Sequence, residues 1–133
     1  MKIFSKTPFP KEFSYNELKV FMILKKLNID FITQYPIQIP DTINNRMITY
    51  YADFFIRKYD YRTMKCNGLD IEVDSEFHFL TKGRIRKDEE RDEELKKYGI
   101  ETLRIREDDL KDEEKLKSLI INKLKELGVK IKE

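Results

Sequence analysis

The chain has few of the residues that mark disulfide-rich, metal-cluster or linker-containing proteins. Its 133 residues include one cysteine, Cys66, which excludes an intramolecular disulfide and a zinc cluster built on cysteines. Only four glycines and four prolines interrupt the chain, and it contains no Ser/Gly-rich linker and no internal repeat. We therefore expect a single domain over residues 1–133, with its core at about 14–127.

Long apolar runs are also missing. No window approaches the ~18 apolar residues of a transmembrane helix, and residues 1–13 lack the apolar run of a signal peptide. We expect a soluble, cytoplasmic protein with no membrane partner. The net charge of +2 is low for a dedicated nucleic-acid binder, although lysines and arginines can still gather on one face of a near-neutral protein.

The residues that are present predict an α/β fold. Hydrophobic residues make up 40% of the chain, enough for a core beneath a heavily charged surface. Periodicity and turn residues predict the order α-β-β-β-α-β-α: a helix from Ser14, strands at 30–39, 47–56 and 69–77, a helix at 86–99, a strand at 100–105 and a helix at 112–127. A helix that connects two strands of one sheet favours a parallel pair, so we expect a mixed β-sheet flanked by helices.

Local signals fix the ends of several elements. Ser14 and Glu17 have the spacing of a capping box at the start of the first helix. The apolar stripe of that helix is predicted to be Leu18, Phe21, Met22, Leu24 and Leu27. Asn67 and Gly68 are predicted to close a longish hairpin loop between the second and third strands. Gly99 is predicted to end the second helix.

Acidic residues and the single histidine gather at the end of the third predicted strand, IEVDSEFHF, residues 71–79. Because side chains alternate along a strand, one face carries Asp70, Glu72, Asp74 and Glu76. Asp53 is the only acid within the apolar neighbouring strand, and cross-strand neighbours lie about 5 Å apart. We therefore expect Asp53 to lie beside Glu72 or Asp74.

Carboxylates this close favour a bound cation. Without one, like charges that are partly buried drive one carboxyl group to take up a proton. A hard divalent ion such as Mg²⁺ or Mn²⁺ accepts oxygen ligands and retains waters, so two carboxylates suffice. His78 could orient or deprotonate a metal-bound water, a combination that suits hydrolysis of a phosphodiester.

Each of these residues also has an ordinary structural interpretation. Alternating apolar and acidic residues are typical of a half-solvated strand, and a lone histidine is more often structural. An arginine such as Arg57, Arg91 or Arg104 could neutralise Asp53. Glu17 lies on or beside the core-facing stripe of its helix, but the capping box explains it as well. Asp88 and Arg91 have the spacing of an intrahelical ion pair.

The ordered set of motifs resembles a known family. The motifs are Asp53-Phe54, then Glu72-Val73-Asp74 with His78, then Asp88, Arg91, Leu95 and Gly99, and last Leu103-Arg104-Ile105. In this order they resemble the family related to very-short-patch-repair (Vsr-like) endonucleases, within the restriction-endonuclease-like PD-(D/E)XK superfamily. Glu17 and the segment 34–37 also resemble that family's first helix and its Q-x-P-I stretch. The chain is similar too to homing endonucleases with an E-D-x-H-D pattern.

The resemblance implies a restriction-endonuclease-like fold and metal-dependent cleavage or nicking of DNA, with Mg²⁺ (or Mn²⁺) as cofactor. Asp53 would be the principal metal ligand, and Glu72 and Asp74 would complete or support the metal site. His78 would be the base or would position the water. By position, the E-D-x-H-D pattern adds Glu17, which would orient the base, and Asp88.

The sequence departs from the family at several positions. Ser75 replaces the usual glycine, and Ile105 replaces an aromatic residue. The superfamily's E-x-K is E-x-D here, so no lysine lies beside Glu72 and the role of His78 becomes more important. The alternative is a non-catalytic nucleic-acid-binding or assembly module that has kept the fold. Because no separate DNA-reading domain is evident, specificity would come from loops, a homodimer or a partner protein.

Overall fold

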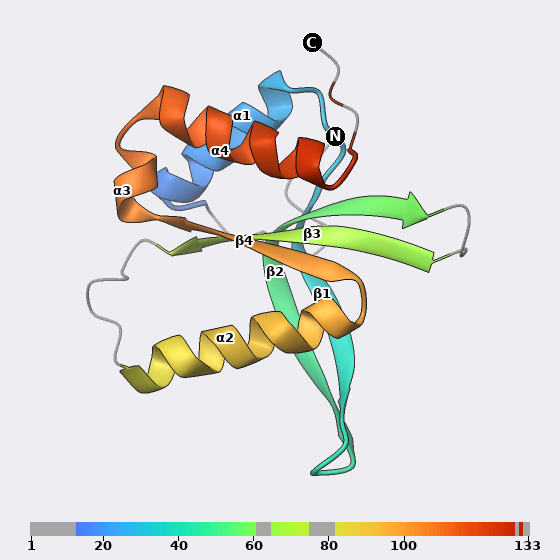
Figure 1. The fold of residues 1–133 in the computed structure, drawn as a ribbon. Coiled ribbons are helices and arrows are strands. Elements are labelled where there is room, and N and C mark those ends of the chain that lie inside the picture. Colours follow the sequence, from blue (N-terminus) through green and yellow to red (C-terminus); the bar gives the residue numbers. More distant parts are fainter. Residues whose placement is uncertain (1–12, 61–64, 75–81, 130, 132–133) are drawn as a thin grey trace.

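The chain forms an α/β fold around one four-stranded sheet. A computed structural model describes residues 13–60, 65–74, 82–129 and 131 (Figure 1). Its elements, in chain order, are α1 (Tyr15–Lys26), β1 (Ile32–Asp41), β2 (Arg46–Asp60), β3 (Lys65–Asp74), α2 (Lys82–Lys97), β4 (Ile100–Arg106), α3 (Glu107–Leu110) and α4 (Glu113–Glu126). The observed elements include α3, a four-residue helix that the prediction lacks.

The sheet is mixed, as the sequence predicts. Its strand order is β1-β2-β3-β4. β1 and β2 are antiparallel, β2 and β3 are antiparallel, and β3 and β4 are parallel and joined through α2. The edge position of β1 explains why that strand tolerates Pro36, which cannot donate a ladder hydrogen bond.

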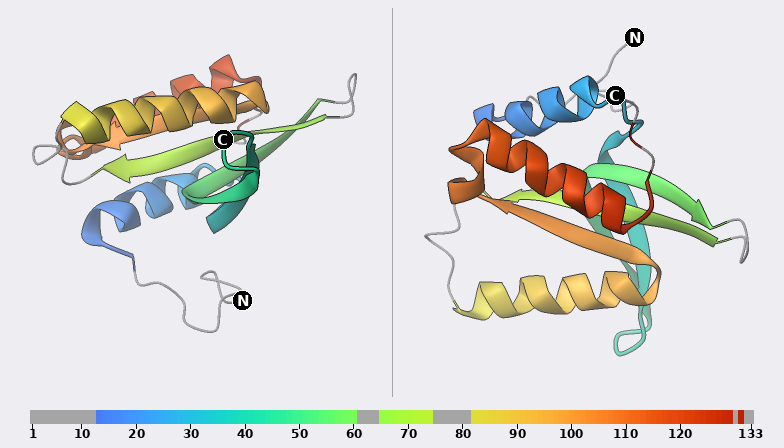
Figure 2. Two further views of the ribbon diagram at one scale, coloured as in Figure 1. Left: turned by 90° about the horizontal axis from the view of Figure 1, so that it is seen from below. Right: turned by 45° about the horizontal axis from the view of Figure 1, so that its top comes forward.

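Helices cover both faces of the sheet. Figures 1 and 2 show α1 and α4 together on one face, with α2 on the opposite face. The amino-terminal end of α2 lies at the side of the sheet toward which β3 and β4 run. The hairpin of β1 and β2 projects away from the α1–α4 layer, with its tip at the far end of the molecule (Figure 1). No helix in the described ranges is long and apolar enough to cross a membrane.

Two apolar clusters lie on the two faces. The larger joins α1, α3 and α4 to the inner side of β2, β3 and β4, and includes Phe54, Ile71 and Ile105. The smaller joins β1 and β2 to α2 through Leu95 and includes Ile37, Ile39, Ala52 and Phe55. Leu95 is the only apolar residue of α2 that is fully buried, so the rest of this helix faces the sheet with polar side chains.

The capping box of α1 is confirmed, but its apolar stripe differs from the prediction. The Ser14 side chain accepts a hydrogen bond from the Glu17 amide, and the Glu17 carboxylate accepts one from the Ser14 amide. Leu18 and Met22 are 44% and 49% exposed, so these two residues do not belong to the buried face. That face consists of Val20, Phe21 and Leu24, which the sequence places on the core-facing side near Glu17, together with Ile23 and Leu27.

The second hairpin is longer than predicted. β2 continues to Asp60 and β3 begins at Lys65, so Asn67 and Gly68 lie within a strand and do not close a loop. A Cβ atom at Gly68 would overlap the ring of Phe55 on the adjacent strand. Gly68 is therefore needed for the close approach of Phe55, whose ring stacks on Tyr35 with centroids 4.5 Å apart.

The second and last helices also differ slightly from expectation. α2 begins at Lys82, four residues before its predicted start. It ends before Gly99, whose φ of 79° is the left-handed conformation that glycine adopts readily. α4 begins after Asp112, whose carboxylate accepts hydrogen bonds from the amides of Glu114 and Lys115.

Candidate functional site

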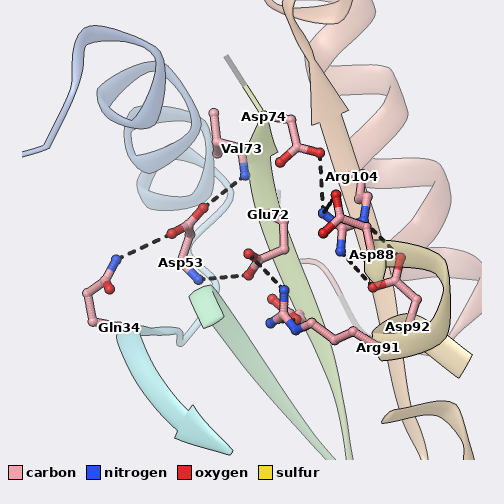
Figure 3. Close-up of polar contacts among 10 residues, drawn as sticks. Gln34, Asp53, Glu72, Val73, Asp74, Asp88, Arg91, Asp92 and Arg104 are labelled. Carbon is pink, nitrogen blue, oxygen red and sulfur yellow. Dashed lines mark hydrogen bonds and ion pairs between the residues drawn. The ribbon is translucent and has the colours of Figure 1, made fainter. Parts of the chain in front are cut away.

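Asp53 and Glu72 meet where the ladder between β2 and β3 stops. The last ladder pair is Phe54 with Ile71. Beyond it, the Asp53 amide donates to Glu72 Oε2 at 3.1 Å, and Asp53 Oδ2 accepts from the Val73 amide at 2.9 Å (Figure 3). Two carboxylates thus replace the backbone pairing, and Asp53 lies beside Glu72 as the strand pattern predicts.

Gln34 of β1 approaches Asp53 from the other side. Its φ of 50° is in the left-handed region, which a glutamine adopts only at a cost in backbone free energy. Gln34 Nε2 lies 3.4 Å from Asp53 Oδ1 (Figure 3). Asp53 is therefore contacted by β1 and β3 together, and both of these donors are uncharged N–H groups.

Arg91 of α2 lies over the acidic face of β3. Its Nη1 bonds to Glu72 Oε1 at 3.2 Å, and its Nη2 bonds to Asp70 Oδ2 at 2.9 Å. The guanidinium also lies 4.9 Å from the ring centroid of Tyr50, a cation–π distance. The intrahelical pair between Arg91 and Asp88 predicted from the sequence was wrong. Arg91 instead pairs with Asp70 and Glu72 of β3, and Asp88 pairs with Arg104 of β4.

Burial separates the protonation states of the two acids bound to Arg91. Burial and the neighbouring Glu72 carboxylate raise the pKa of Asp70 to about 9, against the opposing charge of Arg91. Burial also raises the pKa of Glu72, but Asp70 and Arg91 together bring it below its ordinary value. The pair therefore has a neutral Asp70 and an ionised Glu72 at neutral pH. Asp70 Oδ1 has no hydrogen-bond partner among the described residues.

Arg104 of β4 forms the second centre of ion pairs. Its Nη1 lies 3.3 Å from Asp74 Oδ2 and 3.8 Å from Asp88 Oδ2. Two parallel hydrogen bonds of 2.8 Å join its Nε and Nη2 to the Asp92 carboxylate. Although burial lowers the pKa of Arg104, Asp92 and then the other two acids raise it above its ordinary value. Arg104 thus links β3, β4 and α2 (Figure 3).

The structure places the remaining predicted site residues differently. Glu17 is buried, at 6% exposure, and takes part in the capping box of α1. Phe13, just before this helix, stacks on Phe54, the residue that follows Asp53 in β2. The start of α1 therefore packs on β2 next to Asp53. Asp88 contacts Arg104 and so lies on the Asp74 side of the site. His78, Ser75 and Glu76 lie outside the described residues.

Three contributors were not singled out from the sequence. Gln34 was noted only within a motif, because no local pattern shows that its backbone turns toward Asp53. Asp70 was grouped with the other acids of β3, and its complete burial depends on α2 covering it. Asp92 follows Asp88 by four residues, a helical spacing that could have placed both acids on one inward face.

The donor chemistry at Asp53 and Glu72 fits a hard divalent cation. Both carboxylates supply the oxygen ligands that Mg²⁺ and Mn²⁺ prefer, and Mg²⁺ commonly needs only one or two of them. Among the residues that the structure describes, no group of three or more His, Cys, Asp or Glu side chains is arranged to hold a metal. Asp74 directs its carboxylate to Arg104, so Asp53 and Glu72 are the pair that the geometry brings together.

A separate cavity lies between α2 and β4. It is lined by Asp92, Glu93, Lys96, Lys97, Glu101 and Thr102. None of the carboxylates of Asp53, Glu72 or Asp74 lines it, so the candidate site lies apart from this cavity.

Comparison of the chain with protein-family models, with curated proteins and with solved structures gives no match. The function is therefore argued from the site itself.

Proposed function

We propose that the protein is a metal-dependent DNA endonuclease or nickase with a restriction-endonuclease-like fold. The observation that supports this best is the hydrogen bond from the Asp53 amide to the Glu72 carboxylate, which brings two acidic residues of adjacent strands together where the ladder of β2 and β3 stops. Carboxylates at such a position can hold Mg²⁺, which would activate a water and neutralise charge on a phosphodiester.

The residues around this pair have distinct roles in the proposal. Asp53 is the principal metal ligand, and Glu72 and Asp74 complete or support the site. Gln34 and the Val73 amide orient the Asp53 carboxylate through their hydrogen bonds. Arg91 fixes the direction of Glu72. His78 is proposed as the base or the water-positioning group, and Glu17 as a residue that orients it, from the resemblance alone.

Plasmid nicking tests the proposal. We expect the wild-type protein to relax supercoiled plasmid with Mg²⁺ or Mn²⁺, and Asp53→Asn to lower the rate by at least about a hundredfold, because a metal ion contributes several kcal/mol to such a reaction. Asparagine keeps an oxygen acceptor for the Val73 amide but loses the charge. His78→Ala should also lower the rate strongly. The control is Asp108→Asn, because the Asp108 side chain is 73% exposed and, among the described residues, forms an ion pair only with Lys111.

Metal binding can be measured without turnover. Mg²⁺ or Mn²⁺ should raise the melting temperature of the wild type, since a ligand that binds only the folded state stabilises it. Asp53→Asn should abolish that increase, and Asp108→Asn should retain it. Equal cleavage by wild type and Asp53→Asn would contradict the proposed site.

The second candidate is a non-catalytic nucleic-acid-binding or assembly module. The observation in its favour is that Arg91 and Arg104 already bind the carboxylates of Glu72 and Asp74. Such ion pairs give these acids a structural role without any metal. The module would bind nucleic acid or a partner protein, would show no metal-dependent increase in melting temperature, and would leave plasmid intact with both metals.

A further inference from the structure

The charges of α2 are divided between its two ends. Residues 82–87 contain four cationic side chains and no acid: Lys82, Arg84, Arg86 and Lys87. Residues 88–94 contain six acids and one base, Arg91. We refer to the four cationic residues as the basic end of α2. Ion pairing along the helix would favour mixed charges, so this separation concentrates positive charge at one end.

The basic end is open to solvent. Each of its four residues is exposed. Lys82, Arg86 and Lys87 form no ion pair or hydrogen bond with the part of the chain that the structure describes. Among the described residues of α2 up to Lys87, the apolar side chain is Ile85, which is 39% exposed. The exposed side chains of this end of the helix are thus mainly cationic.

This arrangement opposes the stability of the helix itself. The amino-terminal end of a helix carries a partial positive charge, so cationic side chains there are unfavourable, and the first turn of α2 has no acid to offset them. Lys82 and Arg86 are also four residues apart, where like charges repel on a helix. An anion bound at this end would relieve both effects.

The basic end adjoins the candidate site. Asp88 directly follows Lys87, and its carboxylate lies 3.8 Å from Arg104 Nη1, which bonds to Asp74 at the end of β3. Lys82 is six residues before Asp88, about 9 Å along a helix. Figures 1 and 2 both show the amino-terminal end of α2 at the side where β3 ends.

We propose that the basic end of α2 binds backbone phosphates of duplex DNA next to the proposed cleavage site. This inference rests on DNA being the partner of that site and adds the surface that holds it. Lysine and arginine contacts to phosphates position a protein on duplex DNA without reading its sequence. The low overall charge of +2 is compatible with this surface, because the four cationic residues are contiguous in the helix while the acids of α2 begin at residue 88.

Binding in EDTA tests this surface independently of cleavage. The probe is a fluorescein-labelled 20-base-pair duplex, followed by anisotropy at several salt concentrations. The test variant is Lys82→Gln/Arg86→Gln/Lys87→Gln. The matched control is Lys25→Gln/Lys96→Gln/Lys125→Gln, which removes the same charge from exposed lysines on α1, α4 and the other end of α2.

We expect the test variant to bind at least about tenfold more weakly than wild type at 50 mM salt, and the control to bind within about twofold of it. Each lost phosphate contact lowers the slope of log K against log[salt] by about 0.9, so three contacts lower it by about 2.7. Equal weakening by both variants, no binding of duplex by wild type, or binding only to anionic lipid vesicles would overturn the inference. If the wild type binds the duplex in EDTA but leaves plasmid intact with Mg²⁺ and Mn²⁺, the nuclease proposal is overturned and this binding surface remains supported.

Discussion

At the scale of single residues, the unusual group is Asp70. Its side chain is completely buried, yet it lies beside Glu72 and bonds to Arg91. A raised pKa keeps this carboxyl group protonated while Glu72 stays ionised. Arg91 is then shared between one charged and one neutral acid. Its charge is directed mainly to Glu72, the residue that the proposed function needs in a fixed orientation.

Replacing Asp70 with asparagine should change how stability depends on pH. The folded state holds a proton on Asp70 that the unfolded chain loses above about pH 4, so the contribution of Asp70 to stability is fully present below that pH and is lost as pH rises toward 9. Asp70→Asn removes this loss. The free energy of unfolding of Asp70→Asn relative to wild type should therefore rise with pH, by up to about 1.4 kcal/mol per pH unit.

Urea denaturation at half-unit steps from pH 5 to pH 8.5 measures that difference. Asp108→Asn serves as the surface control and should follow the wild-type curve, because its carboxylate is mostly exposed. Parallel curves for Asp70→Asn and wild type would show that Asp70 is ionised in the folded protein.

The part of the site that lies on β2 and β3 could be predicted from the sequence. The period of two along a strand placed Glu72 and Asp74 opposite the apolar residues Ile71 and Val73, and the hairpin placed Asp53 beside Glu72. The partners that neutralise these acids come from α2 and β4. Which arginine meets which acid depends on the docking angle of α2, and local patterns do not encode that angle.

At the scale of elements, α2 is held to the sheet mainly by charged contacts. Leu95 is its only fully buried apolar residue, whereas Arg91, Asp88 and Asp92 reach the sheet through ion pairs. Arg104 carries several of these pairs at once and is 12% exposed. This explains why periodicity predicted the helix only from 86: its amino-terminal turns have no buried apolar residue to mark them.

Arg104→Met should weaken the attachment of α2. Methionine keeps much of the apolar stem but leaves Asp74, Asp88 and Asp92 without their shared cation. We expect a loss of about 2 kcal/mol in the free energy of unfolding at pH 7, less than for a fully buried pair because the acids are 21–28% exposed.

Chemical denaturation of Arg104→Met beside Lys97→Met provides the comparison. Lys97 pairs with Glu94 at 2.7 Å, but its side chain is 67% exposed, so its loss should cost clearly less stability than the loss of Arg104. A similar small effect for both variants would mean that the contacts of Arg104 contribute little net stability.

At the scale of the whole molecule, one sheet separates two apolar clusters of unequal size. The larger cluster packs α1, α3 and α4 on one face, and the smaller packs α2 against β1 and β2. The mixed sheet and its helices were predictable, since strand and helix periods differ clearly along the chain. The length of the β2–β3 hairpin was not, because Gly68 has the composition of a turn and serves instead to admit Phe55.

Truncating one residue in each cluster should test whether the two faces unfold together. Leu95 and Ile120 are both completely buried, so Leu95→Ala and Ile120→Ala should each cost about 2–5 kcal/mol. β2 contributes to both clusters, and a domain of this size usually unfolds in one step. We therefore expect a single transition for each variant, at the same denaturant concentration by far-UV circular dichroism and by tyrosine fluorescence. Separate transitions in Leu95→Ala would show that α2 unfolds on its own.

The continuous strand β2 ties Asp53 to the strands on both of its sides. The first part of β2 pairs with β1, its last part pairs with β3, and Phe54 and Phe55, directly after Asp53, pair with both. Asp53 itself bonds to β1 through Gln34 and to β3 through Glu72 and Val73. A substitution that changes the pairing of either neighbouring strand would therefore change the hydrogen bonds of the proposed metal ligand.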